Sequence, residues 1–366
     1  MHILKGYTKQ EISWMMYDWA NSAHSVIIVT LLPIFFDTVA GYTADSVSSM
    51  STWGYATSIA MLIVALAAPF LGVFGDIRGM RKKLFSFFML LGVAACAGMA
   101  FTPVMDFTSG PVAAGKVASL ILVLYIVSVI GFDASAIYYD AFLTDVTIED
   151  RMDKVSTMGY GLGYIGGSTI PLLIFLIMNL VGVPMLTCLA FVFGLTAVWW
   201  LAFSLPLLKN CEQTSGKPYE KGDVARSIKG VGTTIKEIIA NKPMLIYILS
   251  YFFYIDGVHT VISMATTYGT NLGLDSTGMM LALLLVQILG LPFCLLYIKC
   301  SEKFGARTMV GFGICVYMFI CIFAFFMNSL WQFWVLAVLC ATSQGGIQAP
   351  VSYTHLRAHE TRSNLV

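Results

Sequence analysis

Long apolar stretches alternate with short polar segments along nearly the whole chain. Ten of them hold about 20 mostly apolar residues, the length that crosses a bilayer as a helix. They are Ser13–Val39, Trp53–Gly75, Leu84–Pro103, Val117–Phe142, Val155–Leu180, Val183–Leu208, Met244–Tyr268, Gly278–Ile298, Thr308–Met327 and Leu330–Ala349. Because hydrocarbon cannot satisfy exposed backbone groups, each is expected to be helical. The pattern predicts an all-α, polytopic membrane protein.

Basic residues fall in alternate connections between these stretches. The ten spans place 18 of the 21 Lys and Arg residues on one side and Lys116 on the other. Cytoplasmic loops carry the excess of Lys and Arg, so the pattern puts the N-terminus in the cytoplasm. The polar N-terminal segment lacks a cleavage pattern, and the first stretch is therefore expected to be retained. We expect a multi-pass protein of the cytoplasmic membrane, surrounded by lipid.

Composition agrees with this assignment and excludes other classes. The chain is 58% hydrophobic and 11% charged, whereas a soluble domain carries about 25% charged residues. It has no Cys pair or Cys/His cluster of metal spacing. It also lacks a recognisable nucleophile–base pattern and a phosphate-binding glycine loop. We therefore expect no cofactor, no metal, no nucleic-acid partner and no enzymatic activity.

Residues 1–208 are predicted to form an N-terminal six-helix bundle, and residues 244–350 a further four helices. Residues 209–243 form a linker between them, in which apolar residues recur at helical spacing with basic residues interleaved. That pattern fits a surface helix on the anionic inner leaflet. A plain solvated linker fits it equally well.

Two features occur twice, in the same order. The first is a turn with an acid, glycine at +3 and arginine at +5: Asp76, Gly79 and Arg81, then Glu302, Gly305 and Arg307. The second is an intramembrane acid with polar residues at +3 and +4: Asp18, Asn21 and Ser22, then Asp256, His259 and Thr260. Because transporters are often built from duplicated bundles, this order indicates a six-helix repeat.

The turn after the second span resembles the loop signature of the major facilitator superfamily. More narrowly, the chain resembles the autophagic vacuole effluxer-like permeases over roughly residues 10–349. The strings that carry this resemblance are Tyr17–Ala23, Tyr138–Leu143, Tyr254–Val258 and Gly345–Ala349. It implies twelve helices in two six-helix bundles and transport of a small solute, with amino acids as the suggested class. It also implies that the turn acid meets the eleventh helix of the superfamily fold and holds the outward-facing state.

The polar segment 351–366 does not continue the apolar pattern and is interpreted as a non-native tail. The zinc-protease motif needs Glu directly after its first histidine, and here Leu356 follows His355. The tail is therefore not expected to bind metal. The chain is interpreted as a C-terminally truncated fragment with ten of twelve helices.

Polar groups inside the spans are costly and are therefore candidates for a solute and proton pathway. The candidates are Asp18, Asn21 and Ser22 in the first span, Asp133 and Asp140 in the fourth, Asp256, His259 and Thr260 in the seventh, and Gln348 in the tenth. The alternative is that they join helices by hydrogen bonds worth about 1 kcal/mol each. Carboxyl and imidazole groups exchange protons, which favours proton coupling.

Five glycines in the fifth span, between Gly159 and Gly167, are interpreted as a close-packing surface. Taken together, these patterns predict a monomeric secondary active transporter that moves a small polar solute by alternating access, coupled to protons. The acid–glycine–arginine turns are its expected conformational latch. The alternatives are a non-transporting receptor or scaffold of transporter descent, or an inactive truncated fragment.

Overall fold

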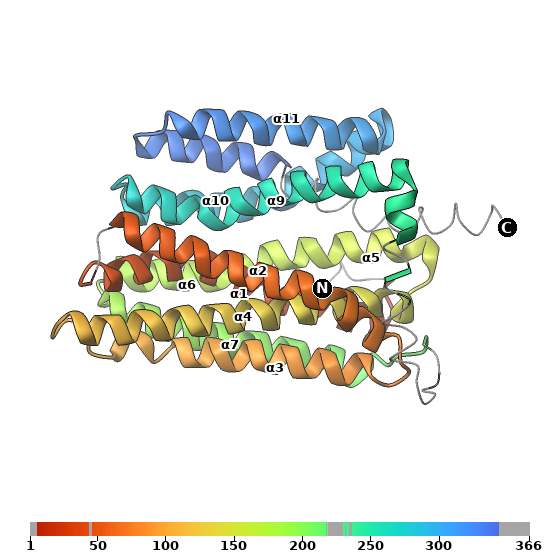
Figure 1. Ribbon diagram of the computed structural model, residues 1–366, viewed down its shortest axis with the longest axis horizontal. Coiled ribbons are helices and arrows are strands. Elements are labelled where there is room, and N and C mark those ends of the chain that lie inside the picture. The colour runs from red at the N-terminus through yellow and green to blue at the C-terminus, as the bar shows by residue number, and fades with distance from the viewer. Residues whose placement is uncertain are drawn as a thin grey trace.

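The computed structural model describes residues 6–43, 46–216, 218, 230, 232–233 and 236–343. Within them the chain forms long helices that lie side by side (Figure 1). The helices of the first part are α1 (Lys9–Ala40), α2 (Ser46–Gly75), α3 (Arg81–Met99), η1 (Thr102–Val104), α4 (Pro111–Val146), α5 (Glu149–Leu162), η2 (Gly163–Ser168), α6 (Thr169–Leu180) and α7 (Met185–Asn210). Those of the second part are α9 (Lys242–Asn271), α10 (Ser276–Phe304), α11 (Ala306–Phe325) and a final helix, Leu330–Ser343.

Among the described residues, eight helices are long and apolar enough to cross a membrane. Two shorter apolar stretches, Ser276–Gly290 and Leu330–Ser343, coincide with the remaining two predicted spans. The all-α membrane architecture is confirmed, and the count of ten spans stays a prediction. The fifth span begins at Glu149, six residues before the predicted start, because α5, η2 and α6 follow one another without a break.

Local sequence explains several helix starts. The Thr8 hydroxyl accepts the Glu11 N–H at 3.1 Å, and the Glu11 carboxylate accepts the Thr8 N–H at 2.7 Å. This reciprocal pair caps α1, since the first N–H groups of a helix lack partners within it. Pro111 stands in the first turn of α4, where its missing N–H is no loss.

The first bundle (α1 to α7) surrounds α1. Helix α1 contacts α4, α5, η2 and α7 along its length, and most of its side chains are buried. Aromatic residues fill the centre, among them Trp14, Tyr17 and Trp200. A helix that is apolar on all sides is stable at such a central position.

The second group (α9 to α11 and Leu330–Ser343) has a smaller interior. Val258 of α9 packs with Tyr317 and Ile320 of α11, while Met279 of α10 packs with residues of the final helix. Figure 1 shows α9, α10 and α11 on one side of the first bundle. Their outer faces carry many exposed apolar side chains, as expected for a lipid-facing surface.

Helix α10 contacts α5, η2 and α6 of the first bundle, and two side-chain contacts of α9 with the first bundle lie toward one end of the helices. The Thr266 hydroxyl of α9 donates to the Val29 carbonyl of α1 at 2.9 Å. The Asn271 amide of α9 lies 3.3 Å from the Met50 sulfur of α2. Val29 and Thr266 both lie in the C-terminal halves of their helices, and Met50 lies near the start of α2. This is the end opposite the start of α1.

Candidate solute and proton pathway

Asp18 lies inside the first bundle, on α1, with 7% of its surface exposed. The Tyr139 hydroxyl of α4 donates to its carboxylate at 2.8 Å. The Tyr139 ring stacks on Trp14 at 4.3 Å between centroids, and the Trp14 N–H donates to the Tyr139 carbonyl at 2.9 Å. These contacts fix Tyr139 in place. The candidate acid of the first span therefore has an oriented partner on another helix, as a functional carboxyl inside a membrane requires.

Glycines of α5 and η2 allow α1 to approach at the same level. A methyl group on Gly159 would overlap the Asp18 carboxylate, and one on Gly163 would lie 2.5 Å from the Ser22 hydroxyl. One on Gly167 would overlap the Trp19 carbonyl. These positions leave no room for a side chain, in agreement with the close-packing interpretation. Segment η2 is π-helical, a form that is frequent at functional sites.

Two of the candidate residues on α1, Asp18 and Ser22, therefore face other helices of the first bundle. Asn21 is buried with 8% of its surface exposed. Ser22 lies against η2, and its carbonyl accepts from the Ser168 hydroxyl at 3.4 Å. Ser22 and Asn21 are thus positioned as packing residues next to Asp18.

Asp133 and Asp140 of α4 are seven residues apart, so they share one face of the helix. Asp133 is half-buried, and Asp140, which lies near the end of the predicted span at Phe142, is exposed. Tyr139, the partner of Asp18, is the neighbour of Asp140 on α4. The structure thus places three of the candidate carboxyl groups on the adjoining helices α1 and α4.

On α9, a polar stripe faces the first bundle. Asp256, Thr260, Ser263 and Thr267 follow at intervals of four, three and four residues, so they share one face. Asp256 and Thr260 are exposed, Ser263 is half-buried and Thr267 is 7% exposed. The stripe closes progressively toward the end where Thr266 meets α1. His259, also exposed, lies beside this face.

The predicted latch turn after α2 is built around Arg81. Its guanidinium is paired with Asp145 of α4, and it also donates to the Ala141 carbonyl at 3.0 Å. Asp76, by contrast, has a side chain that is 83% exposed and lies 3.9 Å from Arg81. The turn therefore holds its arginine inward and presents its acid outward.

Both copies of the turn use glycine with a positive φ. Gly79 has φ 80° and Gly305 has φ 85°, a region that residues with a side chain rarely adopt. The sequence repeat thus corresponds to a repeated backbone conformation. The structure does not describe the side chains of Glu302 and Arg307, and Gln348 lies outside the described residues.

A second ionic contact, absent from the sequence prediction, fixes the start of α1. Glu11 is 2% exposed, and its carboxylate accepts from Arg151 at 2.9 and 2.8 Å and from the Thr147 hydroxyl at 2.7 Å. Arg151 also donates to the Gly6 carbonyl at 2.9 Å. Glu11 and Arg151 are far apart along the chain, so their pairing gave no signal in the sequence.

His24 of α1 was also missed. It is 3% exposed, stacks on Phe132 at 4.8 Å and lies 5.0 Å from the Trp200 ring. Within the described part of the chain, neither of its ring nitrogens has a hydrogen-bond partner. His24 lies in the same predicted span as Asp18, which could have marked it as a candidate. Nothing in the sequence, however, showed that His24 is buried and His259 exposed.

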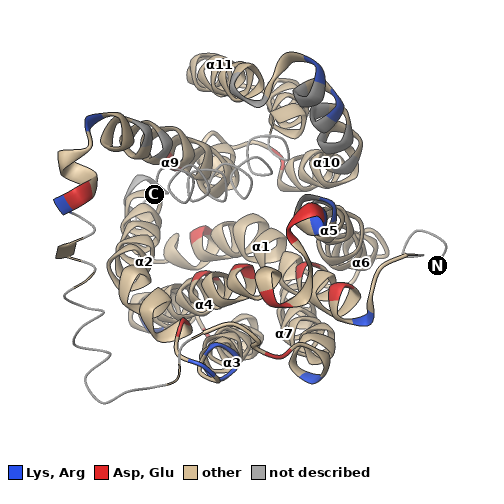
Figure 2. Cartoon of the chain, turned by 90° about the vertical axis from the view of Figure 1, so that its right-hand side faces the viewer, with Lys and Arg blue, Asp and Glu red and all other residues tan. Residues whose placement is uncertain are grey.

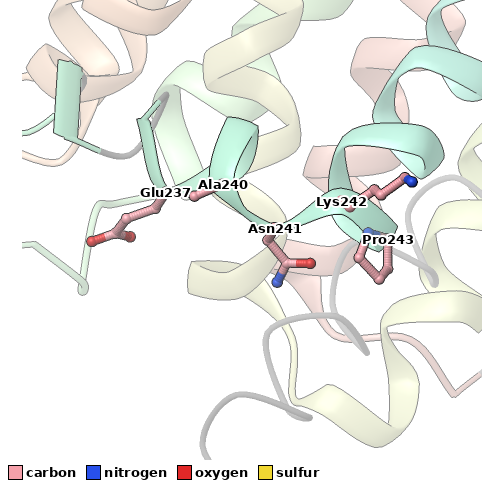
Figure 3. Close-up of a pocket in the computed structure, with 5 residues that line it drawn as sticks. All are labelled: Glu237, Ala240, Asn241, Lys242 and Pro243. Atoms are coloured by element: carbon pink, nitrogen blue, oxygen red, sulfur yellow. The ribbon is translucent and has the colours of Figure 1, made fainter.

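The hollow drawn in Figure 3 lies away from these residues, at the start of α9. It is lined by Glu237, Ala240, Asn241, Lys242 and Pro243. There the Asn241 side chain caps α9 by accepting the Met244 N–H at 3.3 Å. No group of three or more His, Cys, Asp or Glu residues that could hold a metal occurs among the described residues.

Comparison with known proteins identifies the family. The family model described as "Vacuole effluxer Atg22 like" matches residues 42–150 and 144–354. This chain belongs to that family. A Bacillus subtilis (strain 168) protein described as the uncharacterized MFS-type transporter YxiO is 41% identical over 355 residues, covering 95% of this chain and 80% of that protein. Autophagy-related protein 22-1 of Penicillium rubens is 24% identical over 188 residues, covering 48% of this chain and 32% of that protein.

Solved structures agree on the fold. The inward open xylose transporter XylE from E. coli aligns with a TM-score of 0.61 and 15% identity, covering 93% of this chain and 82% of that one. A bacterial homologue of the human lysosomal transporter Spinster, in an inward-facing conformation, aligns with a TM-score of 0.60 and 15% identity. The alignment covers 93% of this chain and 73% of that one. These structures show the major facilitator fold, and the 41% identical MFS-type relative shows that the Atg22-like chain is a transporter of that superfamily. The expectation that it is not an enzyme is confirmed, because its relatives are transporters.

Proposed function

We propose that this Atg22-like protein is a proton-coupled carrier of a small polar solute, and that amino acids are its substrate class. The observation that carries the proposal is the buried Asp18 carboxyl, which Tyr139 binds at 2.8 Å. Its neighbour helix α4 adds Asp133 and Asp140 on one face. Together they form a series of protonatable groups at membrane depth.

The proton part follows from the cost of an intramembrane charge. Burying a carboxylate is unfavourable unless it is paired, and the identified partner of Asp18 is a phenol rather than a cation. Taking up a proton removes that charge, and releasing it on the other side restores it. Asp140, exposed on the adjoining helix, supplies an exchange route to water.

The solute part rests on the stripe along α9 and on family resemblance. Asp256, His259 and Thr260 offer acceptors and donors on a face directed toward the first bundle. A carboxylate binds an ammonium group well, and hydroxyl groups bind a carboxylate. An amino acid carries both groups. The family description, a vacuole effluxer, supports solute transport of this kind.

We further propose that the N-terminus lies in the cytoplasm and that the chain is a monomer in the cytoplasmic membrane. Figure 2 shows Lys and Arg at the helix ends nearest the viewer, at α3, α7, α9 and α10. A cytoplasmic side for this end follows the positive-inside rule. The α9 stripe is exposed toward this end and closed at the other, which supports an inward-facing conformation and alternating access.

The test is uptake of a radiolabelled amino-acid mixture into proteoliposomes, with and without an inward proton gradient. The expected result is faster uptake with the gradient and loss of that acceleration in Asp18→Asn and Asp133→Asn. The matched control is Asp106→Asn, since Asp106 is exposed in the loop before α4 and should not matter. Equal uptake with and without a gradient would refute proton coupling.

The same assay separates the alternatives. A receptor or scaffold of transporter descent, or an inactive fragment, gives no uptake above empty liposomes although the protein inserts and unfolds cooperatively. A carrier of another solute gives no amino-acid uptake either. It still shows solute-dependent proton entry, measured with a pH-sensitive dye inside the liposomes, when a wider set of polar solutes is offered.

A further inference from the structure

The six residues after α7, Cys211–Gly216, fold back against the first bundle. They are the start of the predicted linker to the second group. The Lys82 ammonium donates to the Cys211 carbonyl at 3.1 Å, and the Cys211 side chain is buried against α1, its thiol 3.6 Å from the Gln10 carbonyl. This stretch is thus held to the bundle although it contains no helix of its own.

Both the oxygen and the nitrogen of the Gln213 side-chain amide form hydrogen bonds with the backbone of the turn after α2. Its oxygen accepts the Gly79 N–H at 2.9 Å and the Arg81 N–H at 3.2 Å, and its nitrogen donates to the Gly75 carbonyl at 3.0 Å. Arg81 is the first residue of α3, and no side chain caps α3 from its own N-cap position. Gln213 therefore supplies, from a distant segment, a partner that the start of α3 lacks.

Thr214 and Ser215 complete the surroundings of Asp145. The carboxylate accepts the Thr214 N–H at 3.1 Å, the Thr214 hydroxyl at 2.9 Å and the Ser215 N–H at 2.8 Å. Arg81 pairs with Asp145 and donates to the Ser215 hydroxyl at 3.1 Å. The side chains of Arg81 and Asp145 are 6% and 0% exposed. Two buried charges need such additional hydrogen bonds, since their pairing alone does not offset their desolvation.

The segment ends beside the turn acid. Gly216 has φ 113°, and a methyl group on it would lie 2.7 Å from the Asp76 carbonyl. The Asp76 carboxylate itself stays 83% exposed. Residues 211–216 therefore contact the backbone of the turn from Gly75 to Arg81 and leave the Asp76 carboxylate exposed.

We propose that Gln213 is a positioning residue for the transport cycle: it fastens the linker to the α2–α3 turn, so that Arg81 stays on Asp145 and Asp76 stays exposed. The proposal rests on transport by alternating access and on the latch role that the sequence predicts for this turn. Motion of the second group then reaches the linker only beyond Gly216. The turn moves as one body with α4.

Hydrogen–deuterium exchange of the full chain in lipid nanodiscs tests the bonds without any solute. Replacing Gln213→Ala frees the amides of Gly79 and Arg81, and their exchange should rise about fivefold for each bond of about 1 kcal/mol lost. The control Glu212→Ala removes an exposed neighbour and should leave the turn protected. Unchanged protection of the turn in Gln213→Ala overturns the proposal.

A second readout distinguishes positioning from simple capping. If the turn takes part in closure at this end, loosening it disfavours that closure. The contact between Thr266 and Val29 at the other end should then open less often, so peptides containing these residues should exchange more slowly in Gln213→Ala. A loosened turn with no change at Thr266 and Val29 reduces Gln213 to a helix cap and contradicts the proposal. Gln213→Glu, which keeps the acceptor oxygens, should restore part of both effects.

Neither readout uses uptake, so failure of the proposed solute or of proton coupling leaves this result interpretable. Where uptake is observed, Gln213→Ala should lower its maximal rate and leave the half-saturating amino-acid concentration unchanged. A raised half-saturating concentration at an unchanged maximal rate would instead place Gln213 in solute binding and count against a positioning role.

Discussion

Helices α1 and α9 carry the same polar pattern and have different surroundings. In an apolar stretch of 18 residues within α1, 78% of the residues are buried, whereas in the corresponding stretch of α9 only 6% are buried. Asp18 of α1 is hydrogen-bonded by Tyr139 and lies against Gly159. Asp256, its counterpart on α9, is exposed. One pattern thus yields an enclosed carboxyl in the first bundle and an accessible one in the second group.

The neighbours explain the difference. Helix α1 meets α5 and η2, whose glycines let the backbones approach, and the aromatic residues of α4 and α7 fill the remaining space. Helix α9 packs through Val258 on the face opposite its polar stripe. The comparison teaches that the repeated acid marks a position in the fold, whereas its environment depends on the partner helices. Four substitutions test this, in order of expected effect.

Arg151→Ala should give the largest loss of stability, because it leaves the Glu11 carboxylate buried without its cation. We expect about 2–3 kcal/mol, the scale of hydrogen bonds to charged groups, measured by thermal unfolding in detergent. The matched change in the second group is Lys303→Ala, which removes an exposed ammonium lying 5.3 Å from the Phe304 ring. Comparable losses for the two variants would break the proposed contrast.

Gly167→Ala should destabilise by about 2 kcal/mol, because the added methyl group meets the Trp19 backbone, which cannot move aside. Gly257→Ala on α9 has open space around its new methyl group. It should leave stability unchanged or raise it by up to about 1 kcal/mol, since alanine favours helix. Melting temperatures measured by tryptophan fluorescence decide the matter. A stable Gly167→Ala variant would show that α1 and η2 are not closely packed.

Tyr139→Phe should cost about 1 kcal/mol, the net value of one buried hydrogen bond, because it removes the donor to Asp18. Tyr55→Phe is the control, since Tyr55 is 72% exposed. Chemical unfolding midpoints of the two variants give the comparison. If the loss of stability in the double variant Asp18→Asn, Tyr139→Phe equals the sum of the two single losses, the residues are not coupled; a coupled pair loses less than the sum.

Thr266→Val should cost about 0.6 kcal/mol, typical of a hydrogen bond between helices in a membrane, because it removes the donor to Val29. Thr260→Val lies on the exposed part of the α9 stripe and should have a smaller effect on stability. These two variants compare the end of α9 that contacts α1, at Thr266, with the exposed part of the stripe, at Thr260. Equal effects would mean that the contact with α1 adds nothing.

Much of the architecture could be predicted from apolar length alone. Each predicted span coincides with a helical segment, because a bilayer permits few alternatives for a long apolar stretch. The turn glycines Gly79 and Gly305 were found by their spacing, and their positive φ explains why that spacing carries glycine. The quoted strings around Asp18 and Tyr139 led to the family that the comparisons show.

Partners could not be predicted in the same way. The sequence placed Asp76 and Arg81 in one turn, but it did not show that Arg81 turns inward to Asp145 while Asp76 stays exposed. It likewise gave no sign that Gln213 caps α3. These pairs join residues that are far apart along the chain.

The sequence by itself determined that this protein is a helical membrane protein, because hydrophobic length and charge distribution are read residue by residue. Its turn signature and quoted strings added the resemblance to the major facilitator superfamily. Tertiary structure alone decided which of the repeated polar groups are enclosed. Asp18 and Asp256 have the same local pattern, but only Asp18 meets a glycine face and a fixed tyrosine. The physical reason is that the burial and pairing of a carboxyl depend on the helices packed around it, and helix packing is a property of the assembled fold.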